Sequence, residues 1–157
     1  MIKPWMIIGA VTFLVGSAGS LLRSQDRKWF MHLRRPRWLT FEKAIPLIWI
    51  FVFICGAVSA TLVWRENPGS NYTWFLMSFY LLVETTIVAY TPLMCISRSL
   101  IVGTVIGGVG FLLGVILTLL VFPVSNTAAF LLFPYIIWSP IGTYTTWEMS
   151  RLNPESK

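Results

Sequence analysis

The chain has 157 residues, of which 56% are hydrophobic and 11% are charged, and its formal net charge is +6. Soluble domains are nearer one quarter charged, and a chain of this length needs that polar surface to cover a core in water. The mean hydropathy of +0.73 therefore argues against a soluble enzyme, a disordered tail or a nucleic-acid-binding domain. The composition predicts an integral membrane protein.

Five apolar segments are long enough to cross the hydrocarbon core of a bilayer, which takes about 20 helical residues. Glu84 and Pro92 interrupt the third segment, and Pro134 and Pro140 interrupt the fifth. Neighbouring helices can satisfy the backbone groups that proline frees, so we expect kinks there rather than breaks. The sequence thus predicts an all-α membrane protein, a single domain of five transmembrane helices at about residues 4–22, 45–64, 73–96, 100–121 and 128–147.

The basic residues are unequally divided between the two sides that five crossings would create. Lys3 and Arg65 fall on one side, and the other ten lysines and arginines fall on the opposite side. Because Lys and Arg are enriched in cytoplasmic loops, this predicts an outer N-terminus and a cytoplasmic C-terminus. The alternative, a cleaved signal peptide over the first segment, would send seven basic residues of the next loop across the membrane.

The predicted cytoplasmic loop, residues 23–44, interleaves aromatic and basic side chains. Trp29 and Phe30 follow two cations, and Trp38 follows a run of arginines. Positive charge with interfacial aromatics explains most of this pattern. The pattern also suits a flat apolar ligand with carboxylates, because the rings would stack on it and guanidinium groups would pair with its acids. The cations expected to make that pairing are Arg34, Arg35 and Arg37.

Two tryptophans and one acid lie inside the apolar segments. Trp49 and Trp138 are a turn or more from the segment ends, unlike the tryptophans typical of an interfacial belt. An indole at that depth offers a stacking face and one N–H donor, so we expect both to line a cavity. Glu84 lies midway along its segment, where ionisable residues usually face the bundle interior or a wet cavity. It is either a ligand-contacting acid or a neutral packing residue beside Thr85 and Thr86.

The remaining motifs concern helix packing and the kinds of enzyme site that the sequence could form. Small residues at four-residue spacing allow close helix approach, and we expect the glycines of the fourth segment to pack within the chain. Hydrolase, nucleotide-binding and zinc-protease motifs are missing from the sequence, and His32 is the only histidine. We therefore predict no metal site. The glycines concerned are Gly103, Gly107, Gly110 and Gly114.

In combination, three stretches resemble the translocator protein family, the tryptophan-rich sensory proteins also called peripheral benzodiazepine receptors. They are the Trp-Phe-x-x-Leu-x-x-Pro-x-Trp pattern of residues 29–38, Pro46-x-x-Trp49, and the Leu-Leu-Phe-Pro-Tyr-Ile-Ile-Trp run of residues 131–138. The resemblance implies a five-helix bundle, often dimeric, with a pocket that opens toward the cytosol and has the first loop, residues 23–44, as its lid. It also implies binding of porphyrins, haem, sterols and benzodiazepine-type drugs.

The resemblance also implies roles for particular residues. Trp49 and Trp138 match the pocket tryptophans that some bacterial members are reported to use in light-dependent protoporphyrin degradation. Glu84 stands where the family usually has Asn, and Trp147 stands at the Tyr position of a sterol motif, which weakens the case for sterol binding. The expected ligand-binding set is Trp29, Phe30, Trp38, Trp49, Phe53, Glu84, Tyr135, Trp138 and Gly142.

We therefore expect a membrane receptor or sensor that binds a tetrapyrrole (porphyrin, haem or bilin) as ligand, without an obligatory cofactor. Such a protein would act in tetrapyrrole homeostasis or stress signalling, as a homodimer in a bacterial plasma or outer membrane or an organelle membrane. One alternative is a weak photo-oxidative porphyrin-degrading enzyme, with Trp49 and Trp138 as its catalytic residues. Another is a tetrapyrrole or sterol transporter, although transporters commonly show internal repeats.

Overall fold

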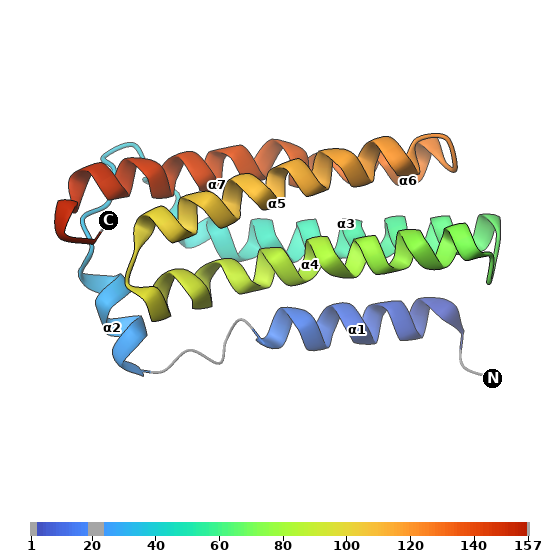
Figure 1. Ribbon diagram of the computed structural model, residues 1–157, viewed down its shortest axis with the longest axis horizontal. Helices are drawn as coiled ribbons and strands as arrows, with labels where there is room; N and C mark the ends of the chain where they lie inside the picture. Colours follow the sequence, from blue (N-terminus) through green and yellow to red (C-terminus); the bar gives the residue numbers. More distant parts are fainter. Residues whose placement is uncertain (1–2, 19–23, 157) are drawn as a thin grey trace.

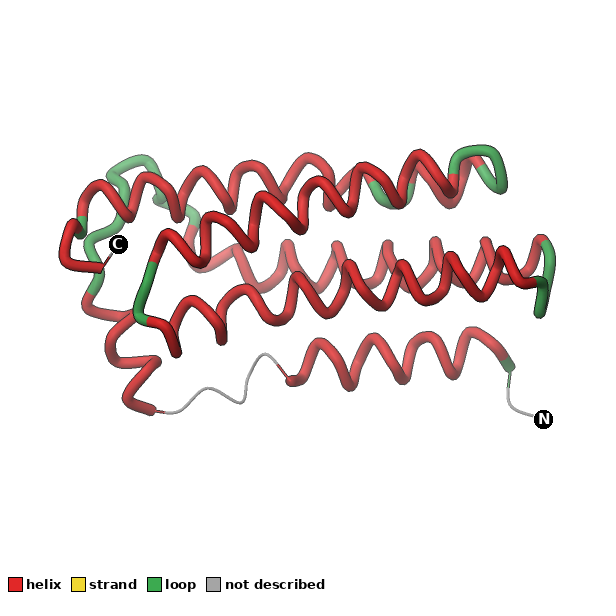
Figure 2. The backbone as a smooth tube through the Cα atoms, in the orientation of Figure 1, coloured by secondary structure: helices red, strands yellow, loops and turns green. Residues whose placement is uncertain are grey.

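The computed structural model describes residues 3–18 and 24–156, and the long helices of this part lie side by side in a bundle (Figure 1). Helices joined by turns and by one longer loop, residues 33–41, make up the described part, without strands (Figure 2). The α-helices are α1 (Pro4–Ala18), α2 (Ser24–His32), α3 (Ile45–Glu66), α4 (Asn71–Ser97), α5 (Leu100–Val121), α6 (Asn126–Phe130) and α7 (Phe133–Leu152), and the 3-10 turns are η1 (Glu42–Ala44) and η2 (Pro154–Ser156).

Three described helices are long and apolar enough to cross a membrane: α3 together with η1, α4, and α5. Helix α1 is apolar but has 15 residues, and residues 19–22, which we expected to complete it, lie outside the described residues. Helix α7 has 20 residues but is not one of the three. A helical membrane protein is therefore supported, while the number of crossings and the sides of the termini stay predictions.

The expected last segment, residues 128–147, is not one helix. Helix α6 ends at Phe130, and α7 begins at Phe133 with Pro134 in its first turn. Proline is well tolerated there because the first amide groups of a helix have no partner within the helix. By contrast, α4 and α7 run on through Pro92 and Pro140.

The expected lid, residues 23–44, also contains regular structure, since α2 and η1 both fall within it. Its first residue, Arg23, lies outside the described residues. Helix α2 has Asp26 in its first turn, where a negative charge suits the helix dipole. The segment is therefore more ordered than a plain cytoplasmic loop.

Serine side chains begin the helices that follow the tight turns. The Ser70 hydroxyl accepts the Thr73 amide at 3.1 Å at the start of α4. The Ser99 hydroxyl accepts the Val102 amide at 3.4 Å at the start of α5. Between α4 and α5, Arg98 adopts a left-handed conformation with φ of 50°. These caps and the turn at Arg98 fold α5 back against α4.

The glycines of α5 let α4 and α7 approach closely, which confirms that they pack within the chain. A Cβ at Gly103 would lie 2.6 Å from the Met94 sulfur, and one at Gly107 would lie 2.5 Å from the Thr143 hydroxyl. At Gly110 it would lie 2.9 Å from the Tyr135 hydroxyl. Only glycine leaves room for these neighbours, so α5 forms the centre of the packing.

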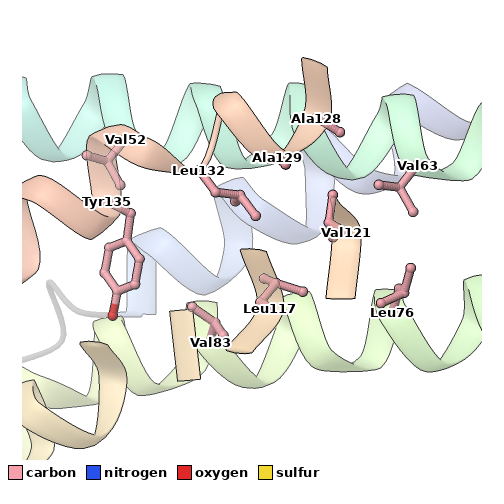
Figure 3. Packing of buried hydrophobic residues seen from close by; sticks show 10 residues of the cluster. All are labelled: Val52, Val63, Leu76, Val83, Leu117, Val121, Ala128, Ala129, Leu132 and Tyr135. Atoms are coloured by element: carbon pink, nitrogen blue, oxygen red, sulfur yellow. The ribbon is translucent and has the colours of Figure 1, made fainter. Parts of the chain in front are cut away.

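The main hydrophobic core joins α3, α4, α5, α6 and α7, and Figure 3 shows ten of its residues. Val63, Leu76 and Val121 are fully buried there. The Ser59 hydroxyl of α3 donates to the Ala128 carbonyl at 2.7 Å and ties α6 to the bundle. A second cluster around Leu33 packs the loop onto the ends of α4, α5 and α7. Helix α1 contacts α3 and α4, yet none of its residues is buried.

Candidate functional site

A cavity of about 440 Å³ opens in the half of the bundle that carries α2 and the C-terminus. We call it the loop-side cavity, because Leu39 and Glu42 of the loop line its edge and the rest of its wall comes mainly from α3, α4, α5 and α7. The structure brings together in it these predicted site residues: Phe30, Arg35, Trp49, Phe53, Tyr135, Trp138 and Gly142.

Aromatic rings form much of the wall. The ring centroid of Trp49 lies 6.2 Å from that of Phe53 and 6.5 Å from that of Tyr135. Across the cavity wall, the loop residue Phe41 meets Trp138 edge-on at 6.3 Å. Such a wall offers flat apolar surface to a planar ligand.

Trp138 carries the least satisfied polar atom of the cavity. Its side chain is 8% exposed, and its Nε1 is buried without a hydrogen-bond acceptor among the described residues. An unsatisfied buried donor costs about 1–3 kcal/mol. A ligand that placed an acceptor at this N–H would recover that free energy.

The segment that covers the cavity is tied to the end of α7 by hydrogen bonds. The Trp38 Nε1 donates to Glu148 at 2.5 Å. The Asn153 side chain accepts the Arg34 amide at 2.9 Å and donates to the Arg34 carbonyl at 3.1 Å. Trp38 itself lies outside the lining, where it packs beside Tyr144 at 6.0 Å. Trp38 therefore fastens the loop to α7 and does not form part of the cavity wall.

Of the three arginines expected to pair with ligand acids, Arg35 alone lines the cavity. Its guanidinium donates to Glu42 at 3.1 Å and to the carbonyls of Phe30 and Leu33, both at 2.9 Å. It also lies over the Phe30 ring at 4.6 Å. Arg34 and Arg37 are exposed. The arginine at the cavity edge therefore already holds the loop together.

Glu84 and Trp29 are two predicted residues that the structure places elsewhere. Glu84 lines a different cavity, nearer α6. Trp29 packs against the second hydrophobic cluster, on the side of Leu33 and Met94. A single ligand between Trp49, Trp138 and Glu84 is therefore not what the arrangement favours.

Hydroxyl groups on the cavity wall were not predicted. The Thr86, Thr143 and Thr145 hydroxyls donate to backbone carbonyls of their own helices at 2.7–2.9 Å, and Tyr90 shares a hydrogen bond with Thr146. Because these groups already have partners, they add polarity without demanding a ligand. The three threonines at residues 143, 145 and 146 of an apolar segment were the available indication. The described residues contain no cluster of potential metal ligands.

These features define a helical membrane protein with an aromatic cavity beneath a clasped loop. The sequence model of the TspO/MBR family matches residues 7–152, and the chain belongs to that family. This confirms the resemblance found in the sequence.

Relatives align along most of the chain. The chain is 29% identical to the tryptophan-rich protein TspO of Bacillus cereus, over 98% of this chain and 99% of that protein. It is 25% identical to the uncharacterized membrane protein YtaB of Bacillus subtilis, over 94% and 97%. It is 26% identical to translocator protein 2 of Mus musculus, over 75% and 74%.

Proposed function

We propose that this protein is a membrane receptor that binds a tetrapyrrole in the loop-side cavity. The observation that carries the proposal is the aromatic wall of this cavity, which includes Trp138, whose buried indole N–H has no acceptor among the described residues. A planar macrocycle would stack on this wall and offer an acceptor to the indole. Large apolar burial with a few oriented polar contacts is the usual arrangement of a small-molecule site.

The charges near the cavity suggest how the ligand would be oriented. A propionate at the cavity edge would lie beside Arg35, where it would compete with Glu42 for the guanidinium. The uneven distribution of basic residues supports a cytoplasmic position for this end of the bundle and for the C-terminus. We propose a homodimer in the bilayer as the working form.

Trp138→Phe is expected to weaken protoporphyrin binding by about 5- to 10-fold, because the ring is kept and one hydrogen bond worth about 1 kcal/mol is lost. The measurement is a titration of purified protein with protoporphyrin, followed by tryptophan quenching and by the shift of the Soret band. Trp147→Phe is the matched control, since Trp147 belongs to the same helix, is 43% exposed and does not line the cavity. Equal affinities of wild type and both variants would contradict the proposal.

Photo-oxidative degradation is the second candidate, because Trp49 and Trp138 line one cavity. For a receptor, we expect illuminated protoporphyrin to bleach at the same rate on wild type and on a Trp49→Phe, Trp138→Phe double variant, compared at equal occupancy. The Soret absorbance over time measures that rate. Clearly faster bleaching on the wild type would instead support the enzyme, with both indoles as its catalytic groups.

A further inference from the structure

A second cavity, of about 510 Å³, lies in the other half of the bundle between α1, α3 and α4. We call it the Glu84 cavity. It shares three lining residues with the loop-side cavity, namely Phe53, Ile87 and Tyr135. These side chains line both cavities, so the two cavities are neighbours along the bundle.

The cavity exists because α1 packs loosely and α3 presents small residues to it. Helix α1 contributes one wall, including Ile8 and Val11, without burying any of its own residues. On the facing helix the lining includes Gly56 and Ala57, and a Cβ added at Gly56 would meet nothing within 4 Å. Space is therefore available between α1 and α3 for a hydrocarbon group.

Trp64 and Trp74 also line the Glu84 cavity, and they meet edge to face with ring centroids 5.0 Å apart. These residues lie at the end of α3 and the beginning of α4, away from the loop. They give the cavity an aromatic boundary at that end. They also supply two fluorophores that report on its contents.

Among the described residues that line this cavity, Glu84 is the only one with a carboxyl group, and no Lys, Arg or His joins it there. Within the described part of the chain, the ion pair found is that of Arg35 with Glu42, so Glu84 is not neutralised by a salt bridge. Its hydrogen-bonding neighbour is the Thr12 side chain of α1. One hydroxyl leaves most of the acceptor capacity of a carboxylate unused.

Two hydroxyls of the cavity wall, those of Ser78 and Tyr80, are already engaged. Ser78 donates to the Trp74 carbonyl at 3.0 Å. Tyr80 shares a hydrogen bond with Ser59 at 2.5 Å. Glu84 is the acidic group on this largely apolar wall, and the complement of a carboxylate is a cationic donor.

We propose that the Glu84 cavity is a second ligand site, which takes an apolar amine. The hydrocarbon part of the ligand fills the space between α1, α3 and α4, and its single ammonium group donates to Glu84. This site does not depend on tetrapyrrole binding, and its charge preference is opposite, since a ligand carboxylate would meet the carboxylate of Glu84. A charge-assisted hydrogen bond is about twice as strong as a neutral one, which favours an amine over the matching alcohol.

The test compares 1-pyrenemethylamine, 1-pyrenemethanol and 1-pyrenecarboxylate on the full chain in phosphatidylcholine nanodiscs. Energy transfer from tryptophan to pyrene reports binding, and empty nanodiscs correct for partition into lipid. We expect the amine to bind about tenfold more tightly than the alcohol, with the carboxylate weakest. Glu84→Gln should bring amine and alcohol within about twofold of each other, whereas the exposed Glu66→Gln control should keep the difference.

A cavity-filling variant tests the location independently of the acid. Gly56→Leu should abolish specific binding of all three probes. Gly108→Leu is the control and should leave binding unchanged, because a Cβ at Gly108 also meets no atom within 4 Å but Gly108 lines neither cavity. Protoporphyrin titrations on the same variants should match wild type, which separates this site from the loop-side cavity. An amine preference that survives Glu84→Gln, or that disappears with Trp138→Phe instead, would overturn the proposal. Probe signals equal to those of empty nanodiscs would do the same.

Discussion

Gly114→Ala is expected to destabilise the bundle by about 1–3 kcal/mol, the usual cost of an added methyl group in a packed core. A Cβ at this position would overlap the ring of Tyr135, lying 2.7 Å from its Cδ1 atom. Tyr135 is 6% exposed within the main core (Figure 3), so a shift of its ring disturbs the residues packed around it. Either α5 and α7 separate or the core repacks.

Gly108→Ala is the matched control on the same helix. Its added Cβ meets no atom within 4 Å, so only helix propensity changes, and alanine gains up to about 1 kcal/mol over glycine. The two substitutions should therefore move thermal unfolding in opposite directions. The midpoint in one detergent, followed by circular dichroism, measures this. A Gly114 variant as stable as the Gly108 variant would mean that α5 and α7 are not held as closely as the structure has them.

The same glycine matters for both cavities. Tyr135 lines the loop-side cavity and the Glu84 cavity alike, so displacing its ring changes a shared wall. Binding of protoporphyrin and of the pyrene amine should both fall in Gly114→Ala. Neither should fall in the Gly108 control.

The depth of residues along the helices was predictable from the sequence, because segment ends are marked by polar residues and caps. The boundaries Leu100–Val121 agree with the structure, and the depth of Trp49 and Trp138 correctly placed both in one cavity. The close packing of the α5 glycines was equally predictable, since close helix approach needs small residues at helical spacing.

The side of each helix that faces the interior of the bundle was not predictable from the sequence. Leu47 is 69% exposed but as apolar as the fully buried Val63 of the same helix, so the sequence pattern carries little periodic contrast. Glu84 was therefore assigned to the right depth but grouped with the wrong neighbours. Its carboxyl lies on the side of α4 that lines the second cavity with α1, away from Trp138.

The order of the loop was underestimated for a related reason. Helix α2 is too polar to be recognised as an apolar segment, and it is held by tertiary contacts, with Trp29 and Phe30 packed on the second cluster. The hydrogen bonds between Arg34 and Asn153 join residues 119 positions apart. Contacts at such separation are decided by the fold as a whole, and composition does not reveal them.

Asn153→Ala is expected to release the cover of the loop-side cavity. The Asn153 side chain is 6% exposed and makes three hydrogen bonds, to the Arg34 amide, the Arg34 carbonyl and the Met149 carbonyl, at 2.8–3.1 Å. Alanine would leave the two Arg34 backbone groups without these partners, at about 1–3 kcal/mol for each group that stays buried. Because the bonds join the loop to the end of α7, the loss should be local rather than global.

Hydrogen exchange distinguishes a local loss of structure in the loop from a global loss of stability. Amides of residues 33–41 should exchange at least about tenfold faster in Asn153→Ala, the factor that corresponds to about 1.4 kcal/mol, while those in the middle of α5 should keep their protection. Asn126→Ala, at an exposed position at the other end of the bundle, is the control and should change neither. Since the ligand of the proposed receptor must pass this cover, protoporphyrin should also dissociate faster from the Asn153 variant. Unchanged exchange in the loop would show that the hydrogen bond between Trp38 and Glu148 suffices to hold the loop in place. Faster exchange in α5 as well would show that the Asn153 hydrogen bonds stabilise the whole bundle and not the loop alone.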